Sequence, residues 1–173
     1  MSLDKQQLID FLEEIEKELK RKIILVAVGG TAMTLLNLKA STIDVDFTIP
    51  RKDFGEFKRA LDIVPHGFKV DLWNDGMVFS QFLPEDYLDK SRKIRTNLKM
   101  IDLRALDPID IVVTKIGRLI GRDKDDISEC IKKFKLTKSV IKKRAKQIEY
   151  AGNEEVYEIN LKSVLKNFSE YQK

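Results

Sequence analysis

Ile23–Ile49 reads IILVAVGGTAMTLLNLKASTIDVDFTI, and this stretch decides the fold of the chain. Ile23–Val28 is a run of six apolar residues rich in branched side chains, which predicts a strand covered on both faces. The next two residues are glycines, which allow positive φ and a close approach to the backbone because they lack a Cβ. We expect Thr31 to cap a helix over Ala32–Leu38, whose free N–H groups and positive dipole end favour an anion.

Two aspartates follow on the second strand of this stretch. Asp44 and Asp46 lie at positions i and i+2 of a strand expected over Asp44–Ile49. Because side chains alternate along a strand, both carboxylates should point to the same side, roughly 7 Å apart. Two adjacent anions repel each other unless a cation lies between them, and a divalent metal is the usual solution. An anion-binding turn beside such a pair is what a nucleoside triphosphate with magnesium requires.

The order of these features resembles a known family. An apolar strand, then Gly29-Gly30-Thr31, then Asp44-Val45-Asp46 is similar to the Gly-Gly-Ser/Thr and Asp-x-Asp signature of the nucleotidyltransferase superfamily, above all its minimal and toxin-type prokaryotic branches. The resemblance extends from about Ile23 to Ile131. It implies an α+β fold with a mixed sheet of about four to five strands flanked by helices. We expect this core over 1–121 and a helical segment packed on it over 122–173.

The resemblance also implies a third carboxylate, from the strand that follows the Asp-x-Asp strand. Asp71, in the β-prone run Phe68–Trp73, occupies that place, and Asp102 in Met100–Leu103 is the alternative. Together with Asp44 and Asp46, the third acid would hold two Mg²⁺ ions. One ion would bind the attacking oxygen and the other the triphosphate.

A triphosphate-binding lysine is the next implied feature. Relatives have a proline, an acid and a lysine on one helix, followed by arginine and acids on the next helix. This chain has Pro108, Asp110 and Lys115, then Arg122–Asp126, although the acid and the lysine do not keep the usual spacing from the proline. On chemistry alone, a lysine such as Lys115 is more often a solvated helix residue, and the resemblance reverses this preference. Arg122–Asp126 has a plain helix start as its alternative. The residues expected to bind the nucleotide are Gly29, Gly30, Thr31, Lys115, Asp125 and Asp126, with Asp125 or Asp126 orienting Lys115 or Arg118.

These residues predict a magnesium-dependent nucleotidyltransferase that moves a nucleoside monophosphate from a triphosphate to an acceptor hydroxyl. The alternative is a regulatory protein that keeps the fold and binds nucleotide or RNA without catalysis. Threonine in place of serine after the glycine pair, and the unaligned acids near Asp125, leave that alternative open. A Walker phosphate loop is absent because no Lys-Ser/Thr follows the glycines. The glycine fingerprint of a Rossmann site is incomplete.

Composition excludes several other classes. With 43% hydrophobic and 35% charged residues, the chain is expected to fold into a globular protein. The single cysteine, Cys130, and single histidine, His66, exclude a Cys/His zinc site, so any metal would be bound by oxygen. One cysteine favours an intracellular, cytoplasmic setting. No apolar run approaches the roughly 20 residues of a membrane span, and no signal-peptide pattern begins the chain.

The positive charge is concentrated in one segment. Ile131–Gln147 contains eight lysines or arginines between Lys132 and Lys146 and no acid, whereas the net charge of the whole chain is +4. Such a segment favours a polyanion, and tRNA or another RNA is the expected acceptor. A solvated helix face is the plain alternative, and protein or small-molecule hydroxyls remain candidate acceptors. The toxin-type resemblance adds an antitoxin-like protein as an expected partner.

Periodicity predicts the remaining elements. A helix should open cleanly at Asp107-Pro108, with Asp107 as its N-cap and Pro108 in the first turn. Gly76–Leu83 is expected to form either another strand or a loop across the sheet. The other predicted elements are helices over Leu3–Leu19, Asp53–Leu61, Pro84–Lys90, Thr137–Tyr150 and Glu154–Phe168, and a strand over Lys99–Leu106.

Overall fold

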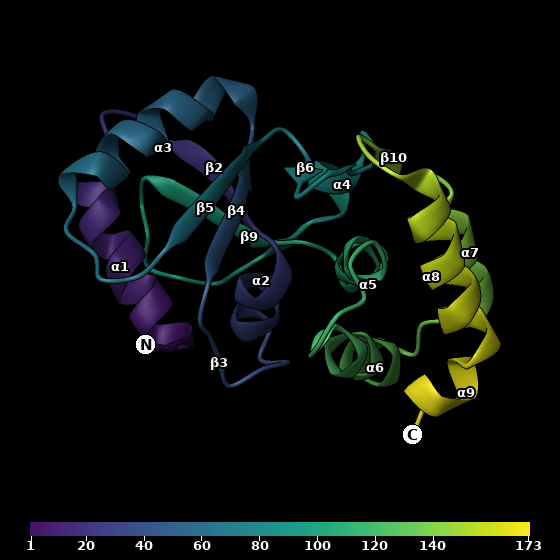
Figure 1. Ribbon diagram of the computed structural model, residues 1–173. Helices are drawn as coiled ribbons and strands as arrows, with labels where there is room; N and C mark the ends of the chain where they lie inside the picture. Colours follow the sequence, from purple (N-terminus) through teal and green to yellow (C-terminus); the bar gives the residue numbers. More distant parts are fainter.

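The computed structural model describes residues 1–173 and is built on a five-stranded mixed sheet (Figure 1). The strand order is β5 (Val70–Asn74), β4 (Val45–Ile49), β2 (Ile23–Ala27), β9 (Ile101–Ala105) and β8 (Arg92–Lys93). Strand β2 runs antiparallel to β4 and parallel to β9, while β4 and β5 are parallel and β8 and β9 antiparallel. The predicted α+β class with a mixed sheet is therefore confirmed.

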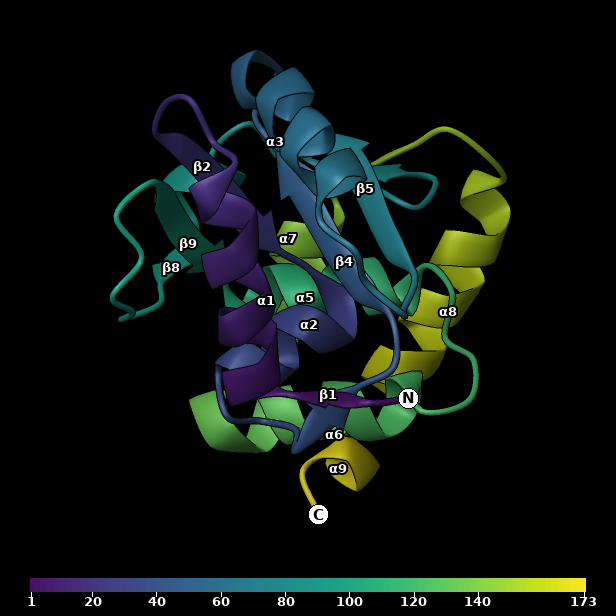
Figure 2. The ribbon, with the colours of Figure 1, turned by 90° about the vertical axis from the view of Figure 1, so that its left-hand side faces the viewer.

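Helices cover both faces of this sheet. Figures 1 and 2 show α1 (Lys5–Lys17) and α3 (Arg51–Ile63) on one face, and α2 (Gly29–Leu35) and α5 (Pro108–Ile116) on the other. Helix α1 begins with a capping box between Asp4 and Gln7 and buries an apolar stripe against the sheet. Helix α5 begins as predicted, since the Asp107 side chain accepts a hydrogen bond from the N–H of Ile109.

A helical region lies beyond α5, on the side away from the sheet (Figure 1). It comprises α6 (Asp123–Phe134), α7 (Lys138–Ala145), α8 (Glu154–Lys166) and α9 (Phe168–Tyr171). Every residue of α5 is buried between the sheet and these helices. From α8, the Tyr157 hydroxyl donates to the Val113 carbonyl at 2.8 Å and Asn160 Nδ2 donates to the Ile116 carbonyl at 2.9 Å. Helix α5 is thus the element that joins the sheet to the C-terminal helices. None of the helices is both long and apolar enough to cross a bilayer.

A second, three-stranded sheet connects the segment after β5 with the C-terminal helical region. Gly76–Leu83 forms the hairpin β6 (Met77–Val78) and β7 (Gln81–Phe82), and β7 pairs with β10 (Glu149–Tyr150). The predicted helix over Thr137–Tyr150 is therefore wrong at its end, because its last two residues pair as a strand. Gln81 Nε2 donates to the Thr114 carbonyl at 2.8 Å, which fixes the hairpin on α5.

The remaining elements are short. Strands β1 (Leu3–Asp4) and β3 (Ser41–Thr42) pair antiparallel in a separate two-stranded sheet, and α4 (Tyr87–Lys90) follows the hairpin. Cys130 is buried in α6, where burial raises the pKa of its thiol to about 12. A thiol in this state is a packing group, as the apolar residues around it in the sequence indicate.

Candidate active site

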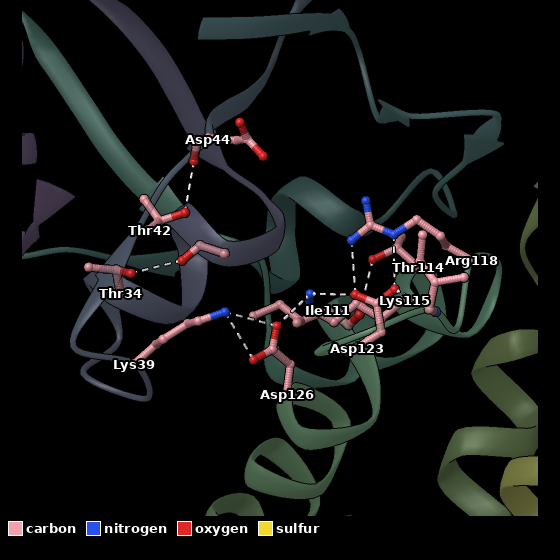
Figure 3. A network of polar contacts seen from close by, with 12 residues as sticks. Thr34, Lys39, Thr42, Asp44, Ile111, Thr114, Lys115, Arg118, Asp123 and Asp126 are labelled. Carbon is pink, nitrogen blue, oxygen red and sulfur yellow. Dashed lines mark hydrogen bonds and ion pairs between the residues drawn. The ribbon is translucent and has the colours of Figure 1, made fainter. Parts of the chain in front are cut away.

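A cavity of about 500 Å³ opens where β2 ends and β4 begins, between the sheet, α5 and α6. Five acids and five bases line it, and they divide into two halves. The acidic half contains Asp46 on β4, Asp71 on β5, and Asp44 and Lys69, which immediately precede these two strands. The basic half contains Lys39 from the loop after α2, Lys115 from α5, Arg118 and Arg122 from the loop that follows, and Asp123 and Asp126 from α6. Figure 3 shows Asp44 on one side of the cavity and the Lys115 network on the other.

Adjacent strands build the acidic half. Asp46 on β4 and Asp71 on β5 are direct partners in a parallel register, and Asp44 immediately precedes β4. The Asp46 side chain is buried, with the residue only 6% exposed, whereas Asp44 faces solvent. Burial, and then the nearby charges of Asp71 and Asp44, raise the pKa of Asp46 to about 7. The three carboxylates that the sequence singled out are therefore electrostatic neighbours.

The partners of these carboxylates differ. Asp71 pairs with Lys69 at 2.8 Å. Asp46 is held by its backbone N–H, which donates to Thr31 Oγ1 at 2.9 Å, and no cation pairs with its carboxylate. No three acid, histidine or cysteine side chains are grouped closely enough to hold a metal ion as they stand. The three carboxylates nonetheless offer only oxygen ligands and carry more negative charge than the nearby cation neutralises. A hard divalent cation requires both properties.

Asp102, the alternative third carboxylate, lies elsewhere. Strand β9 is next to β2 and not to β4, so Asp102 is in register with Ile24. Its carboxylate accepts a hydrogen bond from Arg104 at 2.9 Å and lies 3.8 Å from Lys93. Asp102 lines a different cavity. The structure thus brings Asp71, and not Asp102, to Asp44 and Asp46.

An ion-pair network builds the basic half (Figure 3). The Lys115 ammonium lies 3.1 Å from Asp123 Oδ1 and 2.8 Å from Asp126 Oδ2. Arg118 binds Asp123 through two hydrogen bonds of 2.9 Å, and Lys39 reaches Asp126 at 3.2 Å. Burial alone would raise the pKa of Asp123, but the Arg118 hydrogen bond and the Lys115 charge hold it below its ordinary value. Lys115 is therefore a buried residue of the cavity wall and not a solvated helix residue.

Helix geometry separates the acids of α6. Asp123 and Asp126 are three residues apart and share the face that meets Lys115, whereas Asp125 points into solvent and lines no part of the cavity. Of the two acids expected to orient the lysine, only Asp126 contacts it. Asp123 was not among the expected site residues. The i, i+3 spacing of Asp123 and Asp126 could have indicated Asp123, because it places both acids on one face of a helix that begins at Asp123.

The glycine turn differs from the expectation in one respect. Gly29 and Gly30 line the cavity, and α2 begins at Gly29 itself, where φ is +53°. Thr31 therefore does not cap the helix. Its buried hydroxyl donates to the Asp44 carbonyl at 3.1 Å and accepts from the Asp46 N–H, so it fixes the start of β4 and does not line the cavity.

Close packing explains the second glycine. A Cβ on Gly30 would lie 2.7 Å from Thr42 Oγ1, closer than side chains approach in proteins. The same threonine donates to the Asp44 carbonyl at 2.8 Å. Gly30 and Thr31 thus position the two aspartates through the backbone. Sequence spacing alone did not indicate this role, nor the participation of Lys39.

Comparison with known families agrees with this geometry. The family model described as Nucleotidyltransferase of unknown function (DUF6036) matches residues 6–173. No curated protein and no solved structure matches the chain. Because the matched residues span the sheet, the cavity and the C-terminal helices, the chain belongs to this family of nucleotidyltransferases of unknown function.

Proposed function

We propose that this protein transfers a nucleoside monophosphate from a nucleoside triphosphate to an acceptor hydroxyl within the cavity between β4 and α6. The observation that carries the proposal is the division of the cavity into an acidic and a basic half. A triphosphate with bound magnesium presents both cations and anions, and a cavity of this kind can neutralise both. Membership of a nucleotidyltransferase family supports the same class of reaction.

The basic half would bind the β- and γ-phosphates. An ammonium group has three N–H donors, and Lys115 directs two of them to Asp123 and Asp126, which leaves one for a phosphate oxygen. Arg118 uses Nε and one terminal nitrogen on Asp123 and keeps the other nitrogen for the ligand. The acids thus fix the two cations in place before the nucleotide arrives. Such preorganisation lowers the cost of binding.

The acidic half would act on the acceptor. In the proposed step, the acceptor oxygen attacks the α-phosphorus and forms a new P–O bond. The bond from the α-phosphorus to the α,β-bridging oxygen breaks, and pyrophosphate leaves with the electron pair. The proton of the acceptor hydroxyl passes to the Asp71 carboxylate, which is partly exposed to the cavity.

Asp44, Asp46 and Asp71 would hold Mg²⁺, and two bound ions would supply the positive charge that stabilises the attacking and leaving oxygens. The buried Asp46 carboxylate, with no cationic partner, supports this assignment. Burial and the nearby charges of Asp71 and Asp44 disfavour its negative charge in the absence of a cation, and they raise its pKa.

RNA, including tRNA, is the acceptor that we propose. Seven lysines between Lys132 and Lys146 are exposed and available to phosphates. Arg144 is not, because it is buried in ion pairs with Asp110 at 2.6 Å and Asp86 at 2.7 Å. An antitoxin-like protein partner remains a prediction from the sequence.

The test is incubation with each α-labelled triphosphate, magnesium and total RNA. We expect label to be transferred to RNA, and transfer to fall steeply between about 50 and 200 mM salt because phosphate contacts release counterions. Asp46→Asn and Asp71→Asn should each lower transfer by roughly 1,000-fold or more.

Asp102→Asn is the matched control. It removes a carboxylate from another strand of the same sheet but not from the cavity, so transfer should stay within about threefold of the wild-type rate. Equal losses in Asp71→Asn and Asp102→Asn would refute the assignment of Asp71. Nucleotide binding without transfer by the wild-type chain would instead favour the non-catalytic regulatory alternative.

A further inference from the structure

Phe79 is an apolar residue on the wall of the charged cavity, and the proposed reaction does not use it. It is the first of two residues, Phe79 and Ser80, in the turn between β6 and β7. Its φ is +54°, whereas that of Ser80 is not positive. Turns of this kind favour glycine at the first position, because a bulky L-residue is strained there. Local stability therefore does not account for a phenylalanine at this site, and the residue is still 37% exposed.

Two neighbours hold the Phe79 ring. The ring of Trp73 lies 4.9 Å from it, centroid to centroid, at an angle of 58°. The guanidinium carbon of Arg118 lies 4.9 Å from the same centroid, and Arg118 is itself fixed by Asp123. Trp73 follows Asp71 by two residues on β5 and therefore lies on the same side of that strand. The Phe79 ring thus lies near the junction of the acidic and basic halves of the cavity.

We infer that the Phe79 ring is the surface on which the base of the donor nucleotide stacks, an inference that rests on the proposed function. If the β- and γ-phosphates bind Lys115 and Arg118 and the α-phosphate faces Asp71, the ribose and base leave the α-phosphate at the junction of the two halves. A preformed aromatic ring at that point suits a nucleobase, since any base can stack on an aromatic side chain.

Ile120 extends the same apolar surface. It lies two residues after Arg118, lines the cavity and is 62% exposed. Its neighbours Leu119 and Gly121 both have positive φ, at +48° and +50°. Two turns in the left-handed region thus each present an exposed apolar side chain to a cavity whose other wall residues are mostly charged or polar. We therefore expect binding to favour purines moderately, since their rings offer the larger stacking area.

Trp73 provides the measurement, because it is the single tryptophan of the chain and contacts Phe79. We expect ATP with magnesium to change the fluorescence of Trp73. Inorganic tripolyphosphate should compete with ATP for the phosphate site but leave the fluorescence unchanged. Phe79→Leu keeps an apolar side chain but removes the flat ring, and should weaken ATP binding roughly 5- to 100-fold. It should leave tripolyphosphate binding unchanged.

Two further variants separate binding from folding. Phe82→Leu is the matched control, because Phe82 is on the same hairpin and 40% exposed but lies outside the cavity. It should bind ATP like the wild type. Phe79→Gly removes the ring and relieves the strained backbone, so it should lose ATP affinity while its thermal midpoint stays the same or rises. A lowered midpoint with unchanged ATP affinity would show that the ring only supports the fold.

The outcomes distinguish this inference from the function beneath it. Equal weakening of ATP and tripolyphosphate binding by Phe79→Leu, or no fluorescence response to any nucleotide, would overturn the base site. So would a response that requires RNA, since the ring would then contact the acceptor. Label transfer with normal ATP binding in Phe79→Leu would leave the proposed function standing without the base site. ATP binding that depends on Phe79, with no label transfer by the wild type, would support the base site and count against the proposed function.

Discussion

The central sheet has a hollow at each end of β2, and the two differ in how their charges are partnered. The candidate active site lies at the end of β2, and a second cavity of about 530 Å³ lies at its start. Six cations line the second cavity, together with only two acids, Asp53 and Asp102. Each acid is paired with an arginine, although Asp102 Oδ1 accepts no hydrogen bond. Asp53 binds Arg21 at 2.6 Å and the Ile24 N–H at 2.9 Å, and Asp102 binds Arg104.

The candidate active site shows the opposite arrangement. Its cations Lys115 and Arg118 are paired with acids of α6, whereas the buried Asp46 carboxylate has no cationic partner. The cavities have nearly equal volumes, so size does not distinguish them. We infer that an unpartnered buried acid next to other acids, and not the number of charges, identifies the proposed cation site.

We expect the greatest loss of stability from the replacement of Lys115, a buried cation of the candidate active site that is paired with two acids. Lys115→Ala would leave Asp123 and Asp126 buried with less compensating charge, so the free energy of unfolding should fall by about 3–5 kcal/mol. Lys52→Ala, in the basic cavity, removes an exposed lysine and should change it by no more than about 0.5 kcal/mol. Urea unfolding at pH 7 measures both. Similar changes in the free energy of unfolding for the two variants would contradict the proposed difference between the two cavities.

Asp46 and Asp53, one buried aspartate from each cavity, should change stability in opposite directions when each is replaced by asparagine. In EDTA, folded Asp46 keeps a proton that the unfolded chain has released, because its pKa is raised to about 7. Stability should therefore fall as pH rises from about 4 to about 7, and stay low above that range. Asp46→Asn should abolish this loss and stabilise the protein at pH 8 by roughly 2–4 kcal/mol.

Asp53→Asn should do the reverse. It replaces a buried carboxylate that binds Arg21 and a backbone N–H, so it should destabilise the protein by about 1–3 kcal/mol at the same pH. Thermal unfolding of the three chains between pH 5 and pH 8 measures both effects. Destabilisation of both variants at pH 8 would mean that Asp46 is a satisfied structural acid.

The sequence predicted the elements that local patterns determine. The branched run after Ile23, the apolar stripe of α1 and the Asp107 cap of α5 each specify their own segment, and the structure confirms all three. The pair Asp44 and Asp46 could be identified from the sequence for the same reason. The two carboxylates are close together along the chain, since only Val45 separates them.

What the sequence left open depends on contacts between distant segments. Asp71 and Asp102 both lie within short β-prone runs, and only the strand order places β5 beside β4 and β9 beside β2. Thr31 was expected to cap a helix because its place after two glycines suits a cap. In the structure, the Thr31 hydroxyl forms tertiary hydrogen bonds with the backbone of Asp44 and Asp46 instead. The roles of Asp125 and Asp126 could not be distinguished from the sequence. Only the structure shows which face of α6 meets Lys115, and that Asp126 is the one that contacts it.

The most direct test of the proposed metal-binding acids is a magnesium titration of thermal stability at pH 8, in chains first freed of metal with EDTA. We expect Mg²⁺ to stabilise the wild type and Asp102→Asn by about 1–3 kcal/mol at concentrations well above the dissociation constant. Asp46→Asn and Asp71→Asn should gain much less. Equal stabilisation of all four chains, or none in the wild type, would contradict the assignment of Asp44, Asp46 and Asp71 as the metal-binding acids.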